Sequence, residues 1–158
     1  MKTSPAGIDA IATLEGFSAN PCRDAKGWSK GYGHFIRQGE SSAPITRRQA
    51  RALLEMDIRW AEHCVDTLVR VPLLQCQYDA VVSLVFNIGA SRFGRSVTLT
   101  RINSHSNDAI RKEWSEFRLS SFLVSPSGVL PEVFETRVNP VLVARRKKEL
   151  AMYFGEVA

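Results

Sequence analysis

The sequence QCQYDAVVSLVFNI, at residues 75–88, carries the strongest structural signal in the chain. Wound as a helix, it is apolar on almost every side, and Gly89, a common helix terminator, follows it. A helix that is apolar all round has to be covered by other elements. We therefore predict that residues 75–88 form a central helix in the core of a mostly helical protein.

Capping signals on both sides of this stretch predict further helices. Each start has a side chain that can accept a hydrogen bond from a helix N–H, or a proline in the first turn. The predicted helices run from Ser4 to Gly16, from Thr46 to Pro72 and from Asn139 to about Phe154, with shorter ones near 96–103 and 108–119. The Gly-rich, aromatic sequence of residues 20–40 predicts a small β-hairpin or meander. Residues 120–136 are expected to be irregular.

Length and composition limit the possible classes of protein. The chain has 158 residues, of which 44% are hydrophobic and 23% charged, as in an ordinary folded protein. A chain of this size forms one domain that buries about two-thirds of its unfolded surface. No apolar run approaches the ~20 residues of a bilayer span, and we recognise no secretory leader. We expect a single domain over residues 1–158 without stable membrane insertion.

The cysteines, histidines and charges narrow the choice further. The three cysteines form no Cys-x-x-Cys pair and the three histidines are scattered, so we expect no metal and no other cofactor. The formal charge is +5, and residues 137–158 alone hold five basic and two acidic residues. This excess favours an anionic partner, but no nucleic-acid-binding motif accompanies it, so nucleic acid is not the expected partner.

Two carboxylates near the N-terminus suggest a chemical function. Glu15 lies on the apolar stripe of the first predicted helix, four residues after Ile11. A carboxyl against apolar surface keeps its proton more readily, as a general acid must, although Glu15 also fits a partly exposed position in the last turn. Asp24 follows in a polar turn. Glycoside hydrolases use two carboxylates in such contrasting settings.

The whole run from Glu15 to His34 resembles the signature of the phage-type lysozymes, glycoside hydrolase family 24. It reads EG at 15–16 and DAKGWSKGYGH at 24–34, where that family has Glu-Gly, a later Asp and a Thr-x-Gly-x-Gly-His motif. Further similar stretches are PIT at 44–46, VPL at 71–73, QYDA at 77–80, FNIG at 86–89, RR at 145–146 and EL at 149–150. The resemblance covers about residues 4–154.

This resemblance implies an α+β, mainly α, lysozyme-like fold with two lobes. A small lobe of about residues 16–60 would hold the β-hairpin. A helical lobe of about residues 61–158, together with the N-terminal helix, would surround the buried central helix. The substrate groove would lie between the lobes.

The implied activity is that of a peptidoglycan hydrolase, an inverting N-acetylmuramidase that cleaves the β-1,4 bond between N-acetylmuramic acid and N-acetylglucosamine. Glu15 would be the general acid, while Asp24 and Ser29 would orient the hydrolytic water. Counting back from His34 puts Ser29 at the family's Thr, whereas counting forward from Asp24 puts Lys30 there. Only a hydroxyl can accept a hydrogen bond from water, so we expect Ser29. Inversion requires roughly 6.5–9.5 Å between the two carboxyl groups.

Two charged residues fall on apolar helix faces and need partners. Asp57 lies on the apolar face of the second predicted helix, where an unpaired charge is costly, and we expect it to bind His34. The alternative is a solvated Asp57 at the edge of that face. Arg146 lies among apolar residues of the last helix, and pairing with Glu15 would orient that carboxyl. Arg145 is the alternative partner.

Tyr32 and Asn87 are the expected saccharide contacts. Tyr32 belongs to the Gly-x-Gly-His part of the resemblance, and Asn87 lies at the end of the central helix. Asn87 fits an ordinary helix end nearly as well.

Three alternative functions fit parts of the sequence. A cysteine hydrolase would use Cys22 and His34 with Asp24 or Asn20, but nothing places Cys22 at a helix N-terminus. A lytic transglycosylase would keep the acid and need no water-positioning Asp24. A wall-binding or virion structural module would need neither carboxylate.

The expected partner is bacterial peptidoglycan, bound by a monomer. Without a recognised leader, the protein would be made in the host bacterial cytoplasm and act on the cell wall in the periplasm. A holin, or delivery within a virion or toxin, would then bring it to the wall. The positive charge would favour association with this anionic polymer.

Overall fold

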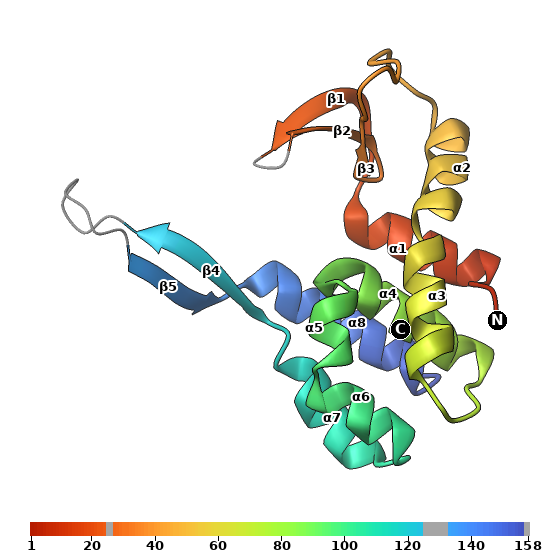
Figure 1. The fold of residues 1–158 in the computed structure, drawn as a ribbon, viewed down its shortest axis with the longest axis vertical. Helices are drawn as coiled ribbons and strands as arrows, with labels where there is room; N and C mark the ends of the chain where they lie inside the picture. The colour runs from red at the N-terminus through yellow and green to blue at the C-terminus, as the bar shows by residue number, and fades with distance from the viewer. Residues whose placement is uncertain (25–26, 125–132, 157–158) are drawn as a thin grey trace.

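One helix at the centre organises the fold. The computed structural model describes residues 1–24, 27–124 and 133–156. In α4 (Gln75–Ile88) every residue from Tyr78 to Val85 is buried. Helices α1 (Pro5–Glu15), α3 (Arg59–Leu68) and α8 (Pro140–Tyr153) contact α4, as Figure 1 shows. The predicted central helix is confirmed.

The predicted capping residues begin their helices. The Ser4 hydroxyl accepts a hydrogen bond from the Gly7 N–H at 3.0 Å, and the Asn139 side chain accepts from the first turn of α8. Thr46 and Gln49 bond reciprocally as a capping box at the start of α2 (Arg47–Asp57). Local signals at these three helix starts are sufficient because each cap satisfies donors that lack a partner inside the helix.

The prediction of one long helix from Thr46 to Pro72 is wrong, because two helices occupy this stretch. Ile58 lies between α2 and α3 and is buried, with φ −75° and ψ −11°. The Ile58 N–H donates to the Leu54 carbonyl and its own carbonyl accepts from the Glu62 N–H. The hydrogen-bond ladder therefore continues across a bend that no glycine or proline marks, while α2 packs on the sheet and α3 on α4.

The predicted β-meander forms a three-stranded antiparallel sheet in the order β1 (Ser18–Asp24), β2 (Gly27–Gly31) and β3 (His34–Phe35). Helix α2 covers it through contacts with β2 and β3. Gly31 has φ +66°, and a Cβ there would lie 2.9 Å from the Cβ of Ala50, so only glycine permits this approach. Residues 25 and 26 of the predicted turn lie outside the described residues.

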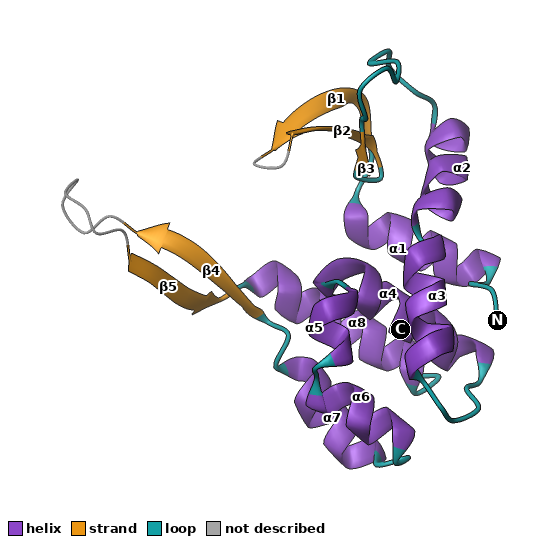
Figure 2. Cartoon of the chain, viewed as in Figure 1, coloured by secondary structure: helices purple, strands orange, loops and turns teal. Residues whose placement is uncertain are grey.

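The expectation that residues 120–136 are irregular is also wrong for residues 120–124 and 133–136, and residues 125–132 lie outside the described part of the chain. Strands β4 (Leu119–Val124) and β5 (Val133–Val138) pair antiparallel from end to end, and Figure 2 shows them extending away from the helices. Their sequences, LSSFLV and VFETRV, are rich in β-branched and aromatic residues. This composition, on both sides of a run with serine, proline and glycine, is typical of a hairpin and was the available signal.

Three short helices complete the helical part: α5 (Ala90–Gly94), α6 (Val97–Asn103) and α7 (Asn107–Ser115). Helix α6 packs on α7, and α7 packs on α8. Among the helices described, none is long and apolar enough to span a bilayer.

The junction of α1 and α4 depends on a close contact at Gly7. The Asp79 carboxylate on α4 accepts hydrogen bonds from the Ser4 N–H at 2.9 Å and from the Ser4 hydroxyl at 2.5 Å. A Cβ at Gly7 would lie 2.5 Å from Cγ of Asp79. The first turn of α1 can therefore approach Asp79 this closely only because residue 7 is a glycine.

We predict that Gly7→Ala lowers the free energy of unfolding by about 1–3 kcal/mol, because the added methyl overpacks the Ser4–Asp79 contact. Urea denaturation measures this change. Gly94→Ala is the control, since its Cβ would meet only the end of Leu68 at 3.4 Å. Equal losses in both variants would contradict the prediction.

Candidate active site

Glu15 is the last residue of α1, and Gly16, at φ +75°, ends the helix behind it. The Arg145 guanidinium on α8 donates from Nη1 to Oε1 of Glu15 at 2.7 Å. The Glu15 side chain is 22% exposed. Instead of lying against apolar surface as expected, the carboxylate is half-buried and held by a cation.

The expected pairing of Arg146 with Glu15 is wrong, since Arg145 makes this contact. Arg146 donates instead to Oδ1 of Asn87 at 2.9 Å and to Oε1 of Glu149 at 3.0 Å. Burial lowers the pKa of Arg146 to about 10, so it remains a cation at neutral pH. Adjacent residues of a helix point about 100° apart. The sequence shows that both arginines lie near the apolar stripe but not which neighbour each one meets.

A cavity of about 310 Å³ lies in front of the Glu15 carboxylate. Its lining residues come from the end of α1, the start of β1 and the strand β2 with its turn: Glu15, Gly16, Phe17, Ser18, Ser29, Lys30, Gly31 and Gly33. Gly33 has φ +81°, and a Cβ there would lie 3.9 Å from Oε2 of Glu15. The structure thus brings the predicted residues Glu15 and Ser29 to one cavity.

The alternation of side chains along β2 separates Ser29 from Lys30. Successive residues of a strand point to opposite faces. Lys30 is buried, and its ammonium donates to the Ser41 carbonyl at 2.5 Å. The Lys30 ammonium is therefore bonded to Ser41, and of these two lining residues only Ser29 carries a hydroxyl.

Asp24 ends β1, where its backbone pairs with Gly27. Its side chain lies outside the described part of the structure. The expected separation of the Glu15 and Asp24 carboxyl groups therefore falls outside it as well.

The predicted contact between His34 and Asp57 is confirmed. Nδ1 of His34 lies 2.8 Å from Oδ2 of Asp57, and Nε2 lies 3.1 Å from Oε2 of Glu40. The backbone N–H of Arg37, and then His34, hold the pKa of Glu40 below its ordinary value. This cluster ties β3 to the end of α2.

A cysteine hydrolase would need its thiol next to an imidazole, and the described residues do not pair Cys22 with His34. Cys22 is exposed, and its Sγ contacts the Ser18 hydroxyl at 3.1 Å and the Asn20 carbonyl at 3.6 Å. Both nitrogens of His34 face carboxylates. Within the described residues, no group of three or more His, Cys, Asp and Glu side chains could hold a metal ion.

A second cavity, of about 470 Å³, shares Gly33 with the first. It is lined by exposed apolar side chains and flanking charges: Gly33, Phe35, Arg37, Met56, Asp57, Arg59, Trp60 and Phe86. Trp60 is 45% exposed and stacks on Phe86 with ring centroids 6.0 Å apart. This aromatic surface is not among the features predicted from the sequence. The available signal was a tryptophan off the apolar stripe of its helix.

The two expected saccharide contacts differ in their surroundings. The ring of Tyr32 is half-buried and packs on Phe17, a lining residue of the first cavity, with centroids 5.5 Å apart. Asn87 is exposed at the end of α4, next to Phe86, and Arg146 holds its side-chain oxygen.

Comparisons with known proteins agree on one family. The sequence model of phage lysozymes matches residues 12–149. The endolysin of Salmonella phage P22 is 33% identical over 160 residues, which cover 98% of this chain and 99% of that protein.

Solved structures give the same result. The muramidase domain of SpmX from Asticaccaulis excentricus is 32% identical with a TM-score of 0.83, over 96% of this chain and 97% of that one. A P22 lysozyme mutant is 31% identical with a TM-score of 0.78, over 98% and 99% of the two chains. These similarities confirm the predicted lysozyme-like α+β fold.

We predict that Asp57→Asn lowers the free energy of unfolding by about 1.5–3 kcal/mol, because a charged hydrogen bond to His34 is lost. Chemical denaturation measures the loss. Glu55→Gln, an exposed position on the same helix, serves as the control and should change stability by no more than about 0.5 kcal/mol. If Asp57→Asn unfolds at the same midpoint concentration of denaturant as the wild type, this contact does not stabilise the fold.

Proposed function

This chain belongs to the phage lysozyme family, and we propose that it is an inverting muramidase. It hydrolyses peptidoglycan, and the proposed bond is the β-1,4 link between N-acetylmuramic acid and N-acetylglucosamine. One observation supports this assignment above the others. The Glu15 carboxylate, held by Arg145 at 2.7 Å, faces a cavity that also contains Ser29.

The two oxygens of Glu15 have different surroundings, which suits a general acid. Oε1 accepts the Arg145 hydrogen bond, whereas Oε2 is the oxygen nearest to Gly33 in the cavity wall. In our proposal Oε2 carries the proton and donates it to the glycosidic oxygen as the bond breaks. The contact with Arg145 fixes the direction of that donation.

The hydrolytic water is assigned to Asp24 and Ser29. A carboxylate accepts a proton from the attacking water, and a hydroxyl next to it can both donate and accept a hydrogen bond. Ser29 pairs with Cys22 of β1 across the sheet, so the hydroxyl and the end of β1 belong to one hairpin. Attack from the face opposite Glu15 inverts the anomeric carbon.

The second cavity extends the saccharide site beyond Gly33. Flat apolar side chains such as Trp60 and Phe35 can pack against the faces of sugar rings, while Arg37 and Arg59 can pair with carboxylates of peptide stems. Asn87, oriented by Arg146, is a further proposed contact. Tyr32, which packs on the cavity residue Phe17, is another proposed contact.

The remaining parts of the proposal concern delivery. The enzyme acts on the cell wall as a monomer in the periplasm. A holin, or transport within a virion or toxin, gives it access to the wall. Its positive surface favours the anionic wall polymer.

Clearing of chloroform-treated Gram-negative cells tests the catalytic assignment. We predict that Glu15→Gln lowers the rate by about 10²–10⁴-fold, the usual contribution of a general acid, and that Asp24→Asn also fails to clear cells. Ser29→Ala should be slower than wild type, and Ser29→Thr should restore activity because it returns the hydroxyl. Glu116→Gln, an exposed change, is the control.

The chemistry of the products separates the alternatives. Hydrolysis with inversion leaves reducing muramic ends of the opposite anomer, which NMR detects directly during the reaction. Products with 1,6-anhydromuramic ends would identify a transglycosylase. Wild-type clearing by Glu15→Gln would overturn the assignment.

The aromatic surface gives a separate prediction. Trp60→Ala should raise KM by about five- to tenfold and leave kcat nearly unchanged, because a remote stacking contact binds substrate and transition state equally. Trp28→Ala is the matched control, since Trp28 is also exposed but lines a different cavity with Pro21 and Ile36. A fall in kcat with KM unchanged would contradict this role.

A further inference from the structure

Glu149 is a fully buried carboxylate on α8, with 0% exposure. It accepts hydrogen bonds from the Ser83 hydroxyl of α4 at 2.9 Å and from the Trp114 indole N–H of α7 at 3.1 Å. It also accepts from Nε of Arg145 and from Nη2 of Arg146, both at 3.0 Å. Three helices therefore converge on one side chain.

The Arg145 guanidinium connects this buried carboxylate to Glu15. Nε of Arg145 donates to Glu149, Nη2 donates to the Ser83 carbonyl at 3.3 Å, and Nη1 donates to Glu15 at 2.7 Å. A guanidinium is planar and rigid, so partners along one edge fix the direction of the opposite N–H groups. The position of Glu149 thereby determines where Nη1 meets the Glu15 carboxylate.

Glu149 also balances charge in the same region. The Arg145 guanidinium lies between the carboxylates of Glu15 and Glu149, and Arg146 pairs with Glu149. Without Glu149, Arg145 would have Glu15 as its one bonded carboxylate, and Arg146 beside it would have none among the contacts described. Cations close to a carboxyl favour its ionised form, which cannot donate a proton.

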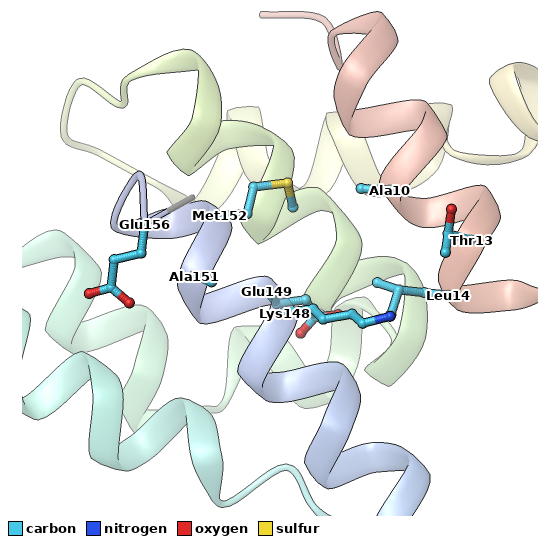
Figure 3. A pocket seen from close by; sticks show the side chains of 8 residues that line it. All are labelled: Ala10, Thr13, Leu14, Lys148, Glu149, Ala151, Met152 and Glu156. Carbon is cyan, nitrogen blue, oxygen red and sulfur yellow. The ribbon is translucent and has the colours of Figure 1, made fainter. Parts of the chain in front are cut away.

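Other charges around these groups are few among the described residues. Lys30 lines the cavity in front of Glu15, but its ammonium is directed to Ser41. Arg92 of α5 is close enough to Arg146 to act on it electrostatically. Lys148 lies beside Glu149 at the cavity of about 320 Å³ between α1 and α8, which Figure 3 shows.

We propose that Glu149 is a positioning residue for catalysis, which acts through Arg145 to orient Glu15 and to set the pH range in which Glu15 works as an acid. This inference rests on the proposed function. It assigns to a core residue an effect on the reaction in addition to its effect on stability.

The test is the pH dependence of kcat and kcat/KM for Glu149→Gln on purified peptidoglycan. We expect kcat to fall by about 10- to 100-fold, because the acid is displaced. We also expect the basic limb of the profile to move by about one unit to lower pH, because uncompensated cations favour ionised Glu15. Ser83→Ala and Trp114→Phe are matched controls that remove neutral donors to Glu149. They should lower stability and leave the basic limb in place.

A double-mutant cycle with Arg145 separates positioning from simple destabilisation. In an Arg145→Gln background the link is already cut, so Glu149→Gln should cause no further loss of kcat. Additive losses, or a basic limb at the wild-type pH in Glu149→Gln, would overturn the proposal. Glu149→Asp keeps the charge with a shorter reach, and should lower kcat without moving the basic limb if Glu149→Gln fails to fold.

These outcomes are independent of those for the proposed function. If Glu149→Gln behaves like wild type while Glu15→Gln is inactive, the enzyme is a muramidase and only the role of Glu149 is wrong. If Glu15→Gln is active, the proposed function itself fails.

Discussion

Two adjacent arginines, Arg145 and Arg146, are buried on one helix, and much of the structure follows from this constraint. A buried charge is costly unless it is paired and hydrogen-bonded, and removal of one partner leaves the other uncompensated. Glu149 is available to both arginines from their own helix, but each needs a further acceptor. Arg145 finds Glu15 at the end of α1, and Arg146 finds Asn87 at the end of α4. The partners that these two arginines require thus bring the ends of α1 and α4 together against the middle of α8.

Much of the fold could be predicted from the sequence, because its strongest signals are local. The caps at Ser4, Thr46 and Asn139 and the apolar run of α4 depend on neighbours within a few residues. The bend at Ile58 could not be predicted, because it reflects two different packing surfaces and not a helix-breaking residue. The β4–β5 pair was not predicted, although both strands have a β-prone composition. The serine and proline residues of that region are typical of loops, and they were weighed above the strand signal.

The features of the candidate site also fall into two groups, those that the sequence predicts and those that depend on how the helices pack. The meeting of Glu15 and Ser29 at one cavity was expected from the family resemblance, and the His34–Asp57 contact from the cost of an unpaired charge on an apolar face. The choice between Arg145 and Arg146 could not, because it depends on the rotation of α8 against α1, which sequence periodicity does not define to within one residue. Trp60 was missed for a related reason. An exposed aromatic residue can be assigned to a binding surface only when the side chains around it are known.

The contact between Glu15 and Arg145 spans 130 residues of sequence. Closing so long a loop is entropically costly, and contacts of this separation form late when a chain folds. The Glu15 carboxylate is therefore oriented only after the last helix has docked on the first. A ribosome-bound chain that has not yet released α8 lacks this geometry. Under the proposed mechanism, lytic competence therefore comes with the completion of folding and not with synthesis of the segment that contains Glu15.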